Sequence, residues 1–167
     1  MRISHMLAAS ALVALTSTAS FADKFVGYGA IDGWNVHIDT EKKSCLVETK
    51  DALDNVIQMG LTTDRGIGYI GVFTKAETDI KRDDKEAVAI KLGDEIYFGE
   101  ATGMRGNITK GYSGGYVLTD NPAVFEAIAR EQTMFVFPEK HYGFTVDLTG
   151  TAKALNLARK CNAEQTQ

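Results

Sequence analysis

Apolar and polar side chains alternate over much of the chain from residue 25 onward. In residues 33–39, Trp34, Val36 and Ile38 fall on one face and polar side chains on the other, which is the two-residue period of a half-buried strand. Further short runs, separated by turn-forming residues, predict strands at 25–30, 44–49, 56–61, 67–74, 87–92, 95–100, 106–110, 115–118, 133–137 and 143–148. The pattern therefore favours a protein built mainly from β-strands.

Two segments have the period of a helix instead. Asn121 and Pro122 supply an N-cap and a first-turn proline for a helix predicted over residues 122–130. A second helix is predicted to begin at Thr149 or Thr151 and to run to Cys161. These short strands, together with two short helices of which the second is C-terminal, predict an antiparallel β-sandwich or an open barrel.

The first 22 residues do not fit this pattern. Arg2 precedes an uncharged apolar run over residues 6–15, and Ser20-Phe21-Ala22 offers the small residues of a cleavage site. The run is too short for a membrane span, which needs about twenty residues, and no later segment is apolar enough to span as a helix. We predict a signal peptide at 1–22, one β-rich domain at 23–161, a disordered tail at 162–167, and a periplasmic or secreted location.

The charged residues limit the possible partners. The net charge is −4 at pH 7, from 18 basic and 22 acidic residues. No cluster of lysine and arginine is long enough to follow a phosphate backbone, which argues against nucleic acid as a partner. The mixed charges are typical of a solvated surface.

Cys45 and Cys161 are the two cysteines of the chain. In an exported protein a single pair most simply forms a disulfide. The alternatives are a redox pair, which usually has the Cys-x-x-Cys spacing, or a pair of metal ligands. The distance in sequence favours the structural disulfide.

A glycine-rich segment, Gly66-Ile-Gly-Tyr-Ile-Gly71, matches the letters of the dinucleotide fingerprint. That fingerprint requires a helix directly after the glycines, so that the pyrophosphate lies at the helix N-terminus. Here Val72-Phe-Thr74 continues as a predicted strand. The glycines therefore favour a closely packed strand, and no cofactor is predicted.

A second segment, Gly111-Tyr-Ser-Gly-Gly115, matches the nucleophile elbow of serine hydrolases. Ser113 would be the nucleophile, and Asp120 and His141 follow in the acid–histidine order. The elbow requires a turn from strand into helix, whereas a strand is predicted to follow Gly115. A glycine-rich hairpin tip is the favoured interpretation, and a small hydrolase stays as an alternative function.

His37, Asp39 and Glu41 would share one face if their strand extended that far, and they could offer a weak site for a divalent cation. Polar residues on the solvent side of a strand have the same pattern, and no second histidine or thiolate lies nearby in sequence. Outward-facing polar residues are therefore expected, with cation binding as another alternative.

Several short motifs follow one another in a fixed order: Gly33-Trp34-Asn-Val36, Cys45, the helix at 122–130, Met134-Phe-Val-Phe137, and 144–155 with its Leu148-Thr-Gly150. This order resembles the invasion-associated locus B family of exported alphaproteobacterial proteins. That family often has a further cysteine pair near residues 112–116, which this chain lacks, so a divergent member or a sister group is compatible with the resemblance. The resemblance implies an all-β periplasmic or secreted domain, sometimes associated with host-cell invasion, and assigns no catalytic residue. We expect a non-enzymatic binding protein whose partner is a protein or envelope component.

Overall fold

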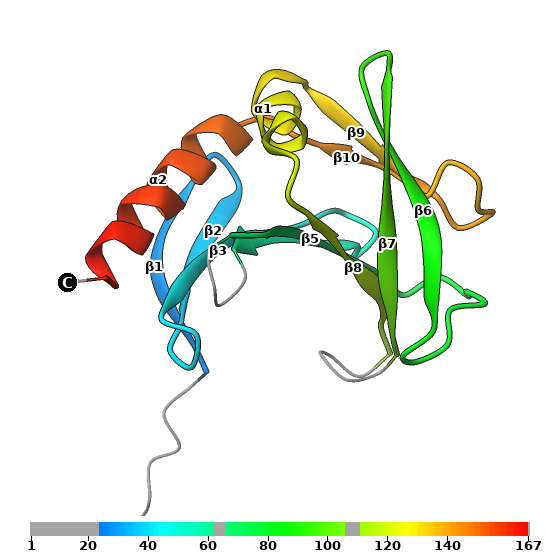
Figure 1. The fold of residues 1–167 in the computed structure, drawn as a ribbon, viewed down its shortest axis with the longest axis horizontal. Coiled ribbons are helices and arrows are strands. Elements are labelled where there is room, and N and C mark those ends of the chain that lie inside the picture. The colour runs from blue at the N-terminus through cyan, green and yellow to red at the C-terminus, as the bar shows by residue number, and fades with distance from the viewer. Residues whose placement is uncertain (1–23, 62–65, 106–110, 167) are drawn as a thin grey trace, which may run out of the picture.

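The computed structural model describes residues 24–61, 66–105 and 111–166 (Figure 1). The predicted signal peptide at 1–22 and the predicted strand at 106–110 lie outside these residues. The described elements are strands β1 (Phe25–Ile31), β2 (Trp34–Asp39), β3 (Ser44–Lys50), β4 (Val56–Leu61), β5 (Gly68–Thr74), β6 (Lys85–Leu92), β7 (Glu95–Arg105), β8 (Ser113–Thr119), β9 (Thr133–Val136) and β10 (Phe144–Asp147), and helices α1 (Pro122–Arg130) and α2 (Thr151–Glu164). They confirm the predicted mainly β fold with a C-terminal helix.

The described strands all belong to one antiparallel sheet, in the spatial order β1-β2-β3-β4-β5-β8-β7-β6-β9-β10. The sheet is open, with β1 and β10 at its edges, and it curves strongly (Figure 1). The two edges approach each other near Trp34. The indole N–H of Trp34 in β2 donates a 3.0 Å hydrogen bond to the carbonyl of Thr149, just after β10. The architecture is therefore an open barrel formed by a single sheet.

Alternation along the strands places one row of apolar side chains after another on the inner face of the curve. In one such row, Val36, Val47, Met59, Ile70 and Val117 are cross-strand neighbours on five adjacent strands. All five are buried, as the two-residue period requires for the face that packs on the core. Trp34, which the alternation places on the same apolar face as Val36, is also buried in the core.

Helix α1 begins as its sequence predicts. The side chain of Asn121 accepts a 3.0 Å hydrogen bond from the backbone N–H of Ala123, and Pro122 occupies the first helical position. The apolar stripe of the helix, formed by Val124, Ala127 and Ile128, joins the core inside the sheet. Helix α1 thus covers part of the concave face (Figure 1).

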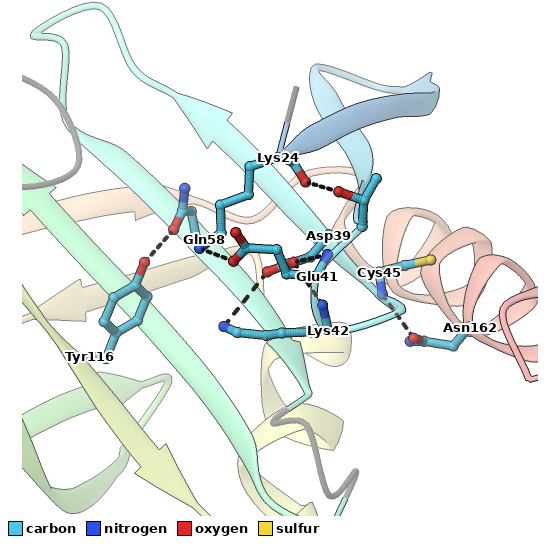
Figure 2. A network of polar contacts seen from close by, with 9 residues as sticks. Lys24, Asp39, Glu41, Lys42, Cys45, Gln58, Tyr116 and Asn162 are labelled. Carbon is cyan, nitrogen blue, oxygen red and sulfur yellow. Dashed lines mark hydrogen bonds and ion pairs between the residues drawn. The ribbon is translucent and has the colours of Figure 1, made fainter. Parts of the chain in front are cut away.

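Helix α2 packs against β1, β2 and β3 and touches α1 (Figure 1). The predicted disulfide between Cys45 and Cys161 is present and ties α2 to β3. The predicted disordered tail is wrong at its start, because α2 continues to Glu164. Asn162 is buried there, and its side-chain oxygen accepts a 2.8 Å hydrogen bond from the backbone N–H of Cys45 (Figure 2). Within the described residues, no helix is long and apolar enough to cross a membrane.

Candidate functional site

The structure does not bring the predicted hydrolase residues together. Ser113 is the first residue of β8, and Asp120 follows the last residue of the same strand. Six residues of extended chain lie between them, so they are roughly 23 Å apart, which is too far for one histidine to contact both, as a nucleophile–base–acid arrangement requires. His141 lies in the turn between β9 and β10, with its ring 4.9 Å from that of Tyr142. Ser113 and Asp120 therefore cannot serve one catalytic centre.

The glycines of the elbow-like motif have a packing role in a strand. Gly114 and Gly115 lie inside β8 and are buried, so the predicted hairpin tip is wrong for Gly114, whereas the strand predicted from Gly115 onward is confirmed. A Cβ atom on Gly114 would lie 1.9 Å from the carbonyl oxygen of Val72. The backbones of β5 and β8 approach too closely here for any side chain.

Two of the three fingerprint-like glycines, Gly68 and Gly71, also lie in a strand, as predicted, whereas Gly66 precedes it. β5 continues through Thr74 and is buried along its whole length. A Cβ atom on Gly68 would lie 2.2 Å from the ring of Phe125, and one on Gly71 would lie 2.6 Å from the ring of Tyr116. These glycines let aromatic rings lie directly on the sheet, one on each face.

The residues predicted as a possible cation site are engaged within the chain. Asp39 is only 2% exposed, and its Oδ1 accepts hydrogen bonds from the backbone N–H groups of Glu41 (3.1 Å) and Lys42 (3.0 Å) (Figure 2). Glu41 pairs with Lys24 at 2.9 Å. Asp39 was expected to face solvent with His37, but its carboxylate caps the β2–β3 turn instead. Among the described residues no group of three or more His, Cys, Asp or Glu side chains could hold a metal ion.

A polar cluster on the outer face of the sheet is visible only in three dimensions. Gln58 of β4 donates a 2.6 Å hydrogen bond to Glu48 of β3. It also accepts a 2.9 Å hydrogen bond from the hydroxyl of Tyr116 in β8 (Figure 2). Burial raises the pKa of Tyr116 to about 12, so its hydroxyl stays protonated and donates. This cluster joins β3, β4 and β8 and is best explained as a structural contact.

The most ligand-like feature is a hollow of about 310 Å³ between α1, α2 and the ends of β4 and β5. We call it the helix-end pocket. Its apolar lining includes Cys45 and Met59 from the sheet, Leu155 and Ala158 from α2, and Phe125 from α1. The first four of these are buried and form the floor, whereas Phe125 is half-buried and forms a wall. The volume lies at the lower end of the range for small-molecule sites.

Small residues create this hollow. Gly68 has no side chain on the inner face of β5, so the ring of Phe125 rests against the strand there. Ala158 is the smallest residue on the face of α2 that also presents Leu155, Asn162 and Arg159 to the pocket. Larger side chains at either position would fill the space between helix and sheet.

Polar groups are concentrated at the mouth of the pocket. Asp120, Asn121, Glu126 and Arg159 line it and are exposed, so the rim carries charges of both signs. Among the described residues, the two buried side-chain atoms without a hydrogen-bond partner lie elsewhere, in Asp39 and Thr78. The floor therefore offers apolar contact, and the rim offers hydrogen bonds and charge.

Another hollow, of about 340 Å³, is much more polar. Charged side chains such as Asp79 and Glu86 line it. These groups bond within the chain, since Tyr142 donates to Asp79 at 2.8 Å and Lys140 pairs with Glu86 at 2.7 Å. The hydrogen bond from Tyr142 lowers the pKa of Asp79, which holds this carboxylate in its charged form. The helix-end pocket is therefore the better candidate for a ligand site.

No protein-family model matches the chain, and no curated protein or solved structure shows a significant similarity to it.

Proposed function

We propose that this protein is an exported, non-enzymatic binding protein that takes up a small, mainly apolar ligand in the helix-end pocket. The observation that carries the proposal is the combination of a buried apolar floor with a polar, open mouth. Such a hollow, with a few polar groups at one side, is the usual form of a small-molecule site. Binding of the ligand would remove apolar surface of both partners from water.

Two features support export. Disulfides persist mainly in oxidising compartments, and the Cys45–Cys161 bond joins buried residues far apart in sequence. The N-terminal sequence has the order of a signal peptide. Membership in the invasion-associated locus B family, or in a sister group, is part of the same proposal and rests on the sequence motifs alone.

The proposal is tested with the neutral fluorescent probe N-phenyl-1-naphthylamine, whose emission rises in an apolar environment. We expect saturable binding to the wild-type protein. Ala158→Trp, which fills the pocket from α2, should abolish it, whereas Ala152→Trp, at an exposed position of the same helix, should not. Melting temperatures check that both variants fold. Unchanged binding in a folded Ala158→Trp variant would overturn the proposal.

A specific surface favours a second candidate function, contact with an apolar partner such as a protein or envelope component. Phe98 on the outer face of β7 is 80% exposed, and Ile96, Leu118 and Phe135 on the same side are partly exposed. Lys91 of β6 is the cross-strand neighbour of both Ile96 and Phe135, so the patch extends over adjacent strands. Exposed large apolar side chains that gather on one face of a sheet often mark interaction sites.

The two candidates are separable by experiment. Phe98→Ser removes the most exposed ring of the patch and leaves the pocket intact. If the patch binds a partner, this variant should lose partners recovered by cross-linking in envelope extract but retain the fluorescent probe. Loss of the probe in Phe98→Ser would instead assign the probe signal to the patch and count against the pocket.

A further inference from the structure

We infer that the helix-end pocket selects a neutral aromatic ring system of one or two fused rings. This inference rests on the proposed ligand-binding function and names the class of its ligand. Three features of the lining carry it: an aromatic wall, sulfur-containing residues in the floor, and the absence of a charged residue among the buried lining residues.

The aromatic wall is Phe125, in the first half of α1. Its ring lies against β5 at Gly68. This position has to be glycine, because a Cβ atom there would lie 2.2 Å from the ring. The ring is half-buried and lines the pocket, so it offers a surface on which a ligand ring can stack or make an edge-to-face contact. Such ring pairs contribute beyond the area that they bury. A saturated ligand of similar size cannot make these ring–ring contacts and so lacks their contribution to the binding free energy.

The floor adds two sulfur-containing residues, Met59 and the disulfide-bonded Cys45. Thioether sulfur is polarizable and makes favourable contacts with aromatic rings, often at the ring edge. Met59 is fully buried in the row of core residues described above, so the surrounding packing restrains it. The combination of ring and sulfur favours an aromatic ligand over an aliphatic chain.

The floor also favours a ligand whose buried part is uncharged. The buried polar side chain in the lining is Asn162, and its oxygen already accepts the N–H of Cys45. A charge carried into this floor would lose its hydration, and no buried residue of the lining carries an opposite charge to compensate for it. Hydroxyl or amine substituents can instead reach the rim, where Glu126 and Arg159 are exposed.

The size of the hollow limits the ligand. Benzene occupies engineered apolar cavities of about 150 Å³. The helix-end pocket, at about 310 Å³, is therefore large enough for a fused bicyclic ring or for one substituted ring.

The test compares 1-naphthol with decahydro-1-naphthol, its saturated counterpart, by isothermal titration calorimetry on the full chain. We expect 1-naphthol to bind at least about fivefold more tightly, from the ring–ring and sulfur–ring contacts together. Met59→Leu keeps the volume and removes the sulfur, so it should reduce this ratio about twofold or more. Met134→Leu is the matched control, because Met134 is equally buried but does not line the pocket.

The outcomes separate the ligand class from the proposed function. Equal affinities for the two compounds, with binding lost in Ala158→Trp, would overturn the aromatic preference and leave the pocket as a binding site. A ratio that Met59→Leu and Met134→Leu reduce equally would overturn the role of the sulfur. Binding of 2-naphthoate as tight as that of 1-naphthol would overturn the preference for a neutral ring. No binding of either naphthol or of the fluorescent probe would overturn both proposals.

Discussion

Reduction of the Cys45–Cys161 disulfide is expected to lower the stability of this fold by several kilocalories per mole. The bond closes a loop with a sequence separation of 116 residues. The chain-entropy relation for a loop of this length gives about 4.8 kcal/mol at 25 °C, which is an upper figure because denatured chains retain structure. We therefore expect a loss of about 2–5 kcal/mol in the free energy of unfolding.

The assay is urea unfolding of the oxidised protein and of the protein held in dithiothreitol. Trp34 is the single tryptophan of the chain, and its indole bonds to Thr149 two residues before α2. Its fluorescence therefore reports on the region that the disulfide anchors, and far-ultraviolet circular dichroism reports on the whole fold. With an m-value of about 1.5–2 kcal/mol/M, the midpoint should fall by about 1–3 M.

The burial of the bond provides a kinetic check. Cys45 is 1% exposed and Cys161 is fully buried, so dithiothreitol should reduce the native protein only after local opening of α2. Free thiols in the denatured, unreduced protein would refute the disulfide. Thiol titration should first verify that one sample is oxidised and the other reduced. If their unfolding curves then coincide, the predicted loss of unfolding free energy is refuted.

Two further predictions concern backbone packing and surface charge. Gly114→Ala should destabilise the protein by more than about 2 kcal/mol in urea unfolding, because the added Cβ would lie 1.9 Å from a backbone oxygen. The control is Gly27→Ala, which should change the stability much less, because nothing lies within 4 Å of the added Cβ. Lys50 and Lys75 lower the pKa of Asp54 to about 2, which a carboxyl titration followed by nuclear magnetic resonance should detect. Because this folded-state pKa lies below the unfolded value of about 3.9, the contribution of Asp54 to stability is present above that pH and is lost as the pH falls towards 2. Lys50→Met should raise the titration midpoint, and an unchanged midpoint would contradict the pairing.

The strands could be predicted because alternation is a local property of the sequence. The ends of the elements were less predictable, and β7 illustrates the reason. It continues to Arg105, past the predicted end at residue 100. Gly103 suggests a break in the sequence, but it lies opposite Gly115 of β8. A Cβ atom on Gly103 would lie 2.2 Å from the backbone carbonyl oxygen of Lys81, so the glycine lets that segment pack closely on β7. The strand therefore continues through a residue that local propensity disfavours in strands.

The helix-end pocket could not be predicted in the same way. It depends on Gly68 and Ala158, which are distant in sequence and have no chemical signature. Catalytic motifs draw attention to reactive side chains, whereas a hollow is produced by side chains that are small. Cys45 and Cys161 gave the one long-range signal, since a disulfide requires their backbones to be close. That signal placed α2 near β3 but did not indicate the space between them.

Helix α2 connects the stability of the fold with the proposed binding site. The same helix carries Cys161, which ties it to the sheet, and Leu155 and Ala158, which form the pocket floor. If reduction loosens α2, it must weaken ligand binding, and by linkage a bound ligand must oppose reduction by the same free energy. A ligand that binds tenfold more tightly to the oxidised form would therefore disfavour reduction by about 1.4 kcal/mol. Under the proposed function, the disulfide therefore belongs to the framework of the proposed site and also constrains the unfolded chain.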